Sequence, residues 1–259
     1  MKIAVLVKEV PDTWGERRID PITKRVDRSG ARVIDEINEK AVEAALLVKE
    51  ANSGSEVTAI TMGPGSALDT LRKALAMGAD NGIHILDDGL SGSDAMQTSA
   101  ALAAALKGKG FDLIVAGNES TDGRTAAVPA MLAERLGLAQ LTFLRTLAVT
   151  GTTVTGERLT EDGYLDVTAQ LPALVSVTEQ IAEARYPNFK GILSAKKKPV
   201  AVLGVADLGL PADEVGGANS WSVVEGVTAG PARSSGTIVT DDGTAAAALV
   251  HYLASAKLI

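Results

Sequence analysis

The stretch LIVAGNESTDGRTAAVPAMLAERL, residues 113–136, changes character twice along its length. It starts with an apolar run at Leu113–Ala116, continues through a polar loop at 117–125, and ends in a segment that predicts a helix from about Thr125 to Leu136. The loop lacks both the Lys followed by Ser or Thr that ends a P-loop and the three spaced glycines of a dinucleotide fingerprint. It still offers backbone N–H groups at a helix N-terminus, where an anion is favoured. The stretch therefore predicts a strand, a polar loop suited to an anion, and a helix.

The same alternation runs through the first half of the chain, where apolar runs alternate with segments of helical period. The predicted strands are Ile3–Val7, Val57–Met62, Ile83–Leu86 and Leu113–Ala116, and the other predicted helices are Asn38–Glu50, Ser66–Met77 and Asp94–Leu106. Strands that alternate with helices form a parallel sheet covered by helices on both faces. The first half therefore predicts an α/β fold.

The second half is different, because short segments rich in Thr and Val follow Gly137 and are separated by turn signals. They predict antiparallel strands added to the core, at Leu141–Val149, Thr152–Arg158, Tyr164–Gln170 and Leu174–Val177. Residues 204–241 show no periodicity and predict an extended arm, and a helix at about Gly243–Ala256 follows it. We therefore expect an α/β domain over residues 1–203 and a C-terminal arm and helix over residues 204–259.

Composition limits the function. The 25 basic and 32 acidic residues give a net charge of −7, which argues against nucleic-acid binding. The chain has no cysteine, so disulfides and thiol chemistry are excluded, and only two histidines, His84 and His251, argue against a zinc site. The apolar run at Ile3–Val7 is too short for a signal peptide, and no stretch approaches the ~18 apolar residues of a membrane span. We expect a cytoplasmic protein without membrane insertion.

Polar and aromatic residues follow the predicted strands, at the edge where open α/β sheets bind ligands. Lys8, Asp12 and Trp14 follow the first strand, Asp35–Asn38 precede the first helix, and Gly63–Ser66 form a strand-to-helix turn. Each has a structural alternative: Trp14 could cover the sheet edge, Asp35 or Asn38 could cap the helix, and the glycines could serve the turn alone. His84 is most simply a core histidine. Because no acid–base pair stands out, the sequence favours a binding protein over a catalyst.

A second candidate surface lies at residues 185–198. Phe189 is one of only three phenylalanines and stands in a loop rich in Pro, Asn and Gly, which is followed by Lys196, Lys197 and Lys198. The ring either folds inward or serves a partner as an anchor. In a chain of negative net charge, a basic cluster beside an aromatic residue favours docking on an acidic surface.

Taken together, these segments resemble the beta subunits of electron-transfer flavoproteins. The resemblance extends from Lys2 to about Leu210 and is carried by several motifs in order: Val7–Asp12, Asn38–Ala45, Arg72–Asp80, Ala116–Gly123, Leu171–Ser176 and Arg185–Lys198. One departure is Leu165, where the family generally has Glu or Gln. The resemblance implies a Rossmann-like sheet similar to the adenine nucleotide alpha-hydrolases, which buries an AMP without hydrolysing it, while a partner alpha subunit carries the redox FAD.

The resemblance also implies a set of ligand-binding residues. The AMP pocket would be formed by Leu6, Asp35, Glu36, Ile37, Asn38, Met62, Gly117, Asn118, Glu119, Ser120, Thr121, Asp122, Gly123, Arg124, Thr125, Ala126, Ala127 and Val128. Within this set, the residues from Asp122 to Thr125 would meet the phosphate through backbone N–H groups and hydroxyls. Trp14 and Ile37 would form a wall beside the flavin.

By the same resemblance, Phe189 is the anchor of a docking loop for flavin dehydrogenases such as the acyl-CoA dehydrogenases of fatty acid oxidation, and Lys196 to Lys198 flank it. The chain would then be one half of a heterodimer that passes electrons to a membrane quinone oxidoreductase without bond-making catalysis of its own. Two alternatives remain open. One is a bifurcating flavoprotein whose beta subunit binds a second FAD, and the other is a stand-alone ATP-binding stress protein, which would leave the Phe189 loop and the arm unexplained.

Overall fold

The computed structural model describes residues 1–15, 17–228, 230 and 236–259. It divides into two compact units, Met1–Glu225 and Gly226–Ile259. Each unit is described by itself.

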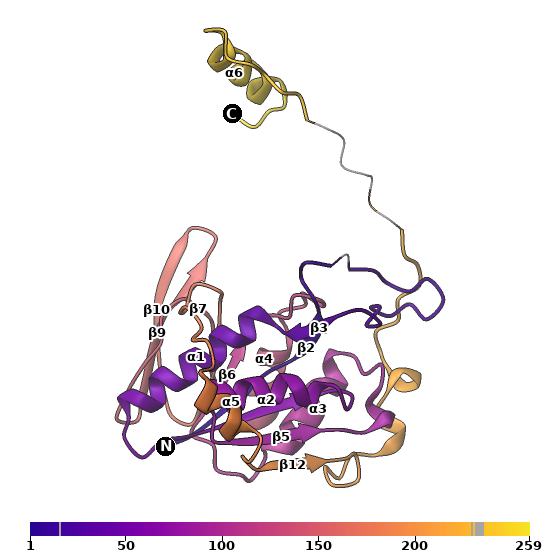
Figure 1. Ribbon diagram of the computed structural model, residues 1–259, viewed down its shortest axis with the longest axis vertical. Helices are drawn as coiled ribbons and strands as arrows, with labels where there is room; N and C mark the ends of the chain where they lie inside the picture. Colours follow the sequence, from indigo (N-terminus) through magenta and orange to yellow (C-terminus); the bar gives the residue numbers. More distant parts are fainter. Residues whose placement is uncertain (16, 229, 231–235) are drawn as a thin grey trace. The chain divides into compact units, whose positions relative to one another are not determined.

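The first unit is built on one sheet with the strand order β10-β9-β7-β11-β6-β1-β4-β5-β12 (Figure 1). The parallel strands are β1 (Lys2–Leu6), β4 (Glu56–Met62), β5 (Asn81–Ile85), β6 (Leu113–Gly117), β7 (Ala139–Leu144), β11 (Ala173–Val177) and β12 (Val200–Leu203). From β1 the chain continues to β4 and β5 on one side, and it then returns to place β6 on the other side of β1. The order of strands therefore reverses between β1 and β6, which is where sheets of this kind bind ligands.

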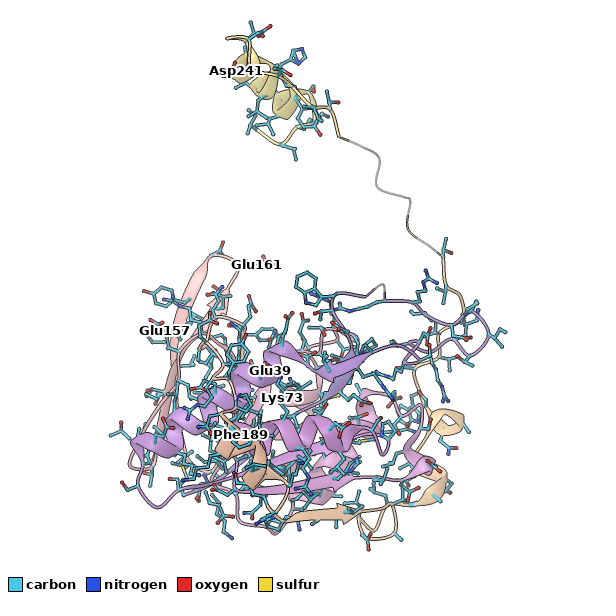
Figure 2. All side chains as sticks on the ribbon, in the orientation of Figure 1. Glu39, Lys73, Glu157, Glu161, Phe189 and Asp241 are labelled. Atoms are coloured by element: carbon cyan, nitrogen blue, oxygen red, sulfur yellow. The ribbon has the colours of Figure 1, made fainter. Side chains whose placement is uncertain are left out.

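Helices cover both faces of the sheet, which explains why its strands are continuous apolar runs. On one face, Ile3 of β1 packs in a core that includes Leu46 of α1 (Glu36–Ala51) and Leu71 of α2 (Ala67–Met77). On the other face, Ala4 packs with residues of α3 (Ala95–Leu106) and α4 (Val128–Leu136). An ion pair between Glu39 of α1 and Lys73 of α2 joins two neighbouring helices (Figure 2). The predicted α/β fold is confirmed.

The antiparallel additions are smaller than the sequence predicts. β9 (Thr153–Thr160) pairs with β10 (Gly163–Gln170) as a hairpin, and β8 (Ala148–Thr150) pairs with β9. The prediction that Leu174–Val177 is antiparallel was wrong, because β11 is parallel to both β6 and β7 and all its residues are buried. The segment predicted as one strand at Leu141–Val149 is divided between β7 and β8. A strand that is buried on both faces is typical of the interior of a parallel sheet, even when its neighbours in the sequence are antiparallel strands.

Three features were not predicted. β2 (Glu9–Pro11) and β3 (Arg32–Ile34) form a separate two-stranded ribbon, and the described residues between them, 12–15 and 17–31, leave the body of the sheet (Figure 1). β12 is an edge strand parallel to β5. α5 (Phe189–Ala195) occupies the segment that the sequence analysis describes as a loop.

Residues 204–225, which the sequence analysis assigns to the arm, belong to the first unit. They contain two short 3-10 helices, η2 (Ala212–Glu214) and η3 (Gly217–Asn219), and a third, η1 (Asp88–Leu90), follows β5. Val215 is buried in the core beside α3, and Leu208 and Leu210 pack against the same cluster. Apolar residues in 3-10 turns show no helical or strand period, so the sequence does not reveal this packing. The structure accordingly divides after Glu225 and not after residue 203.

The second unit contains α6 (Ala245–Ser255), close to the predicted C-terminal helix. Large apolar side chains, among them Leu249, Val250 and Tyr252, are more than half exposed. Within the residues that the structure describes, no helix combines the length and the apolar character needed to cross a membrane.

Candidate functional site

The polar loop singled out in the sequence, residues 117–125, leaves the sheet at the end of β6, beside the end of β1, and the chain between β6 and α4 covers residues 118–127. The backbone N–H of Asn118 donates to the carbonyl of Val177 at 2.8 Å, so the ladder with β11 extends one residue past the strand. Lys8 follows β1 on the other side of the reversal point. The topology thus brings two segments predicted as candidates to the same edge.

Asp35 ties this loop to the start of α1. Its side chain is fully buried, and Oδ1 accepts a hydrogen bond from the backbone N–H of Ile37 at 3.0 Å, which confirms the predicted cap. Oδ2 accepts from both the backbone N–H and the hydroxyl of Thr121, at 2.7 and 2.8 Å. One carboxylate therefore satisfies a helix N-terminus and a loop more than eighty positions away in sequence.

Gly117 allows α1 to approach β6. A Cβ atom at this position would lie 2.5 Å from Nδ2 of Asn38 and 3.0 Å from Cγ2 of Ile37. Both partners are buried, so neither can move freely. Close approach of the helix start to the loop requires glycine here.

Asp122 is the centre of an ionic cluster. Its Oδ1 accepts from the Lys8 ammonium at 2.7 Å, its Oδ2 pairs with Arg28, and Lys8 also donates to the hydroxyl of Ser120 at 3.1 Å. Burial alone would raise the pKa of Asp122, but Lys8, with help from Ser120 and Arg28, lowers it to about 2. The carboxylate is ionised and its side chain is 1% exposed. Its side chain therefore faces cations of the protein, and only its backbone N–H is left to meet an anion.

The second half of the loop is open to solvent. Gly123, Arg124 and Thr125 are exposed, and Arg124 bonds back to Ser120 through its backbone N–H at 2.9 Å and to Glu119 through its side chain at 3.3 Å. Arg124 and Ala126 both have left-handed backbones, with φ of 48° and 53°. Such residues cost on the order of 1 kcal/mol each and persist where the surrounding structure holds them, often at functional sites.

α4 begins where this loop ends. Ala127, the residue before the helix, has no side-chain acceptor to cap it, and Pro129 has no N–H to donate. The remaining N–H groups of the first turn point toward the loop with the positive end of the helix dipole. An anion placed there would satisfy them.

Beside the loop, three side chains share the face of the sheet that α3 and α4 cover. Leu6 and Met62 are half-buried and pack against that core. Asn118 lies on the same face by strand alternation and is 9% exposed, and its Oδ1 has no hydrogen-bond partner among the described residues. An unpaired buried amide oxygen costs roughly 1–3 kcal/mol, which a ligand donor would recover. An apolar floor with one free acceptor is typical of a pocket for a heteroaromatic ring.

Three other predicted candidates, His84, Ser66 and Trp14, lie outside this constellation. His84 is 2% exposed, and its Nε2 lies 3.0 Å from the carbonyl of Gly63, so the core interpretation is confirmed. Ser66, from the same turn, donates to Glu9 at 2.9 Å. Trp14 is 96% exposed, on the segment between β2 and β3, while Ile37 is buried against Gly117.

The Phe189 segment forms a helix that presents apolar side chains. Asn188 caps α5 by accepting from the N–H of Gly191 at 2.8 Å, and Phe189 is 76% exposed at its start (Figure 2). Ile192 and Leu193 are also exposed. The ring is therefore not folded into the core, and its role as an anchor for a partner stays a prediction.

The three lysines after α5 differ from one another. Lys196 and Lys197 are exposed, but the ammonium of Lys198 donates to the carbonyls of Leu75 and Ala79, at 2.8 and 2.6 Å. Burial lowers the pKa of Lys198. Lys198 thus caps the C-terminal end of α2. This role was not predicted, because both carbonyls lie more than a hundred positions away in the sequence.

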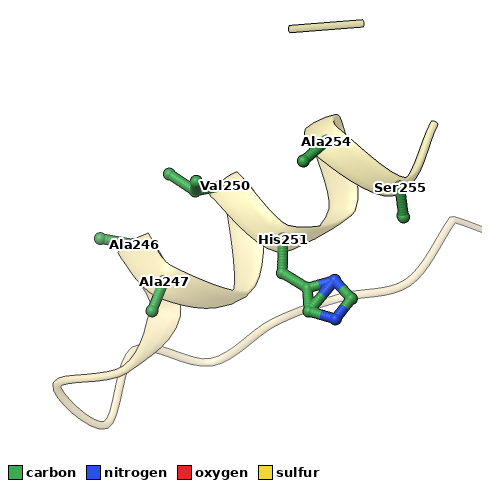
Figure 3. Close-up of a pocket in the computed structure, with 6 residues that line it drawn as sticks. All are labelled: Ala246, Ala247, Val250, His251, Ala254 and Ser255. Carbon is green, nitrogen blue, oxygen red and sulfur yellow. The ribbon is translucent and has the colours of Figure 1, made fainter. Parts of the chain in front are cut away.

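A shallow groove also runs along α6 (Figure 3). Its lining consists of Ala246, Ala247, Val250, His251, Ala254 and Ser255. It offers one imidazole and one hydroxyl among aliphatic groups and no charged partner for a phosphate. This surface suits contact with protein more than a polar ligand.

The fold and the loop define an α/β protein with a doubly wound sheet and a polar site at its reversal point. Residues 23–208 match the family model described as electron transfer flavoprotein domain. The chain is 51% identical over 263 aligned positions to the electron transfer flavoprotein subunit beta of Mycobacterium tuberculosis, covering 99% of both chains. It is also 37% identical to that of Megasphaera elsdenii, over 93% of both, and 36% identical to the caffeyl-CoA reductase-Etf complex subunit CarD of Acetobacterium woodii, over 93% and 92%.

The chain belongs to the electron transfer flavoprotein family, among its beta subunits. The resemblance found in the sequence is confirmed. Membership in this family assigns the chain a role in electron transfer as part of a flavoprotein.

Proposed function

We propose that the chain is the beta subunit of a heterodimeric electron carrier and that it binds AMP in the loop after β6 as a structural ligand, without bond-making catalysis. The observation that carries the nucleotide proposal is the free Oδ1 of Asn118, buried next to a loop that opens onto the uncapped start of α4. The amide would meet a donor of the base, and the helix start would meet the phosphate.

The remaining loop residues fit this ligand. Leu6 and Met62 supply an apolar surface for a purine, and Asp35 holds Thr121 so that the loop cannot move away from α1. The backbone N–H groups of Asp122 and of Thr125 to Val128 would meet the phosphate, with the hydroxyl of Thr125 as a further donor. Those of Gly123 and Arg124 already donate to the carbonyl of Ser120. Ribose contacts would come from Asp35–Asn38 at the start of α1.

The experiment is to purify the heterodimer, release its bound nucleotide and identify it by mass spectrometry. AMP at one equivalent supports the proposal. A second equivalent of FAD in its place would identify a bifurcating carrier, and ATP on an isolated monomer would identify a stand-alone nucleotide-binding protein. No nucleotide at all would refute the assignment of the loop.

Two surfaces support the proposed partners. Trp221 of the first unit is 87% exposed and Ile238 of the second unit is 93% exposed, and an alpha subunit carrying the redox FAD would cover such apolar side chains. α5 exposes Phe189 with Ile192 and Leu193 beside Lys196 and Lys197, as a docking site for flavin dehydrogenases. Electrons would leave for a quinone oxidoreductase.

Trp14 and Ile37 stay predicted as a wall beside the flavin. Ile37 is buried and Trp14 is 96% exposed, so contact with a partner-bound cofactor is proposed for Trp14. The cytoplasmic location stays a prediction from the sequence.

A further inference from the structure

The cluster around Asp122 contains more positive charge than an ion pair needs. Lys8 and Arg28 each carry one positive charge, and Asp122 carries one negative charge, so the three side chains sum to +1. One cation would neutralise the carboxylate. The second is surplus within the cluster and lies beside the loop where an anion is proposed to bind.

We infer that Lys8 and Arg28, oriented by Asp122, bind the phosphate of the nucleotide and make the site select AMP over uncharged adenosine; this inference rests on the nucleotide-binding function proposed above. Asp122 is a positioning residue, while Lys8 and Arg28 touch the ligand. The backbone N–H groups at the start of α4 complete the phosphate site.

Exposure supports this division of roles. The Asp122 side chain is 1% exposed, whereas those of Lys8 and Arg28 are 42% and 35% exposed. Arg28 uses one guanidinium nitrogen for Asp122 and another, at 3.2 Å, for the carbonyl of Glu9, which leaves further N–H groups of its fork available. Lys8 donates to Asp122 and Ser120 and has a third proton to donate.

The acidic side chains nearest the cluster already have partners of their own, and Glu9, next to Lys8 in sequence, pairs with Arg32 at 3.8 Å. Asp35 is fully buried and is satisfied by Ile37 and Thr121 at the positive end of α1. Arg124 and Glu119 pair with each other. Independently of these charges, the buried Oδ1 of Asn118 at the start of the loop has no hydrogen-bond partner among the described residues, so a ligand donor could pair with it.

The test compares AMP with adenosine, by isothermal titration of the heterodimer after its nucleotide has been released. The wild-type protein should bind AMP at least about tenfold more tightly than adenosine, since a charge-assisted hydrogen bond is worth about 1.5–3 kcal/mol. Lys8→Met and Arg28→Met should each lower AMP affinity by about tenfold and leave adenosine affinity within about twofold. Arg25→Met is the matched control, because it removes the same charge from the same segment, where Arg25 contacts Ser91.

Asp122→Asn separates positioning from simple charge. Removal of a negative charge would by itself strengthen AMP binding, whereas release of Lys8 and Arg28 from their anchor should weaken it. The inference therefore requires AMP affinity to fall in this variant, and a rise would overturn the role of Asp122.

Two further results keep the failures distinct. Should the wild-type protein bind neither compound, the proposed nucleotide function fails; should it bind both with equal affinity, the function stands and this inference is wrong. If Arg28→Met does not assemble, the salt dependence of the wild-type protein decides, because added salt should weaken AMP binding and leave adenosine binding unchanged. If added salt left the AMP affinity of the wild-type protein unchanged, the proposed contacts of Lys8 and Arg28 with the phosphate would be wrong.

Discussion

Replacement of Lys198 by Met should destabilise the protein, although nothing in the sequence distinguishes Lys198 from the two lysines that precede it. Methionine keeps most of the aliphatic stem but removes the ammonium that joins the chain after α5 to the carbonyls of Leu75 and Ala79. Lys197→Met is the matched control, because its side chain is exposed.

The magnitude follows from those two contacts. Hydrogen bonds to a charged group contribute about 1.5–3 kcal/mol each when fully sequestered, and a cation at a helix C-terminus adds about 0.3–1 kcal/mol. Lys198 is only partly buried, and the cost of its desolvation, which lowers its pKa, offsets part of the gain. A net loss of about 1–2 kcal/mol is expected, or about 2–8 °C in Tm for a chain of this size.

Thermal unfolding of the heterodimer measures the loss of stability. The rate of reduction by a flavin dehydrogenase at several salt concentrations measures the effect of each lysine on association. Lys198→Met should lower Tm, while Lys197→Met should leave Tm unchanged and slow association at low salt, since exposed charges steer encounters. Equal Tm values for the two variants would show that Lys198 is an ordinary surface lysine and refute the capping role.

Three other outcomes are expected. Phe189→Ala should weaken electron acceptance from a dehydrogenase by ~2 kcal/mol, as loss of an interface anchor does, with an unchanged Tm because the ring is already 76% exposed; a lower Tm with normal electron transfer would place the ring in the fold. Gly117→Ala should cost about 1–3 kcal/mol in unfolding free energy through overlap with Asn38, whereas Gly65→Ala, whose new methyl would meet nothing within 4 Å, should be silent in the same denaturation assay. The pKa of Asp122 in the folded protein, about 2, lies below its ordinary 3.8, so the unfolded chain binds more protons between these values. The stability of the wild-type protein should therefore fall between about pH 4 and pH 2 by about 1–2 kcal/mol more than that of Asp122→Asn. Parallel stability curves of the two proteins, from denaturant midpoints, would contradict the shift.

Local patterns carry much of the fold. The apolar runs at β1, β4, β5 and β6 and the helices between them follow from period and length alone, and Asp35 is recognisable as a cap because capping is a contact between near neighbours. β11 shows the limit: its residues predict a strand, but nothing in them says that β6 and β7 will lie on either side in parallel. Strand partners are set by the tertiary arrangement, which no short window contains.

The same limit applies to the site. The loop from Gly117 to Val128 is visible in the sequence as a polar interruption before a helix, and Lys8 is visible as a charge after a strand. Arg28 is not, because it lies in a polar segment without period and meets Asp122 only through the fold. α5 was missed for a different reason: a seven-residue helix capped by Asn188 has too few turns to show a period.

The arrangement explains how a ligand without a chemical role could still be retained. Asp35 hydrogen-bonds the loop to the start of α1, and Asp122 forms ion pairs with Lys8 after β1 and with Arg28 on the segment that carries Trp14. Between these contacts, Asn118 and the start of α4 still have polar groups without hydrogen-bond partners. A nucleotide bound there would join four separate segments at the point where the strand order reverses. By mass action, a ligand that binds only the folded state stabilises it by about 2.7 kcal/mol at a hundredfold over its dissociation constant, which is comparable to the strongest single contacts in this site. Occupancy of the site would therefore also bear on the position of the segment that carries the exposed Trp14.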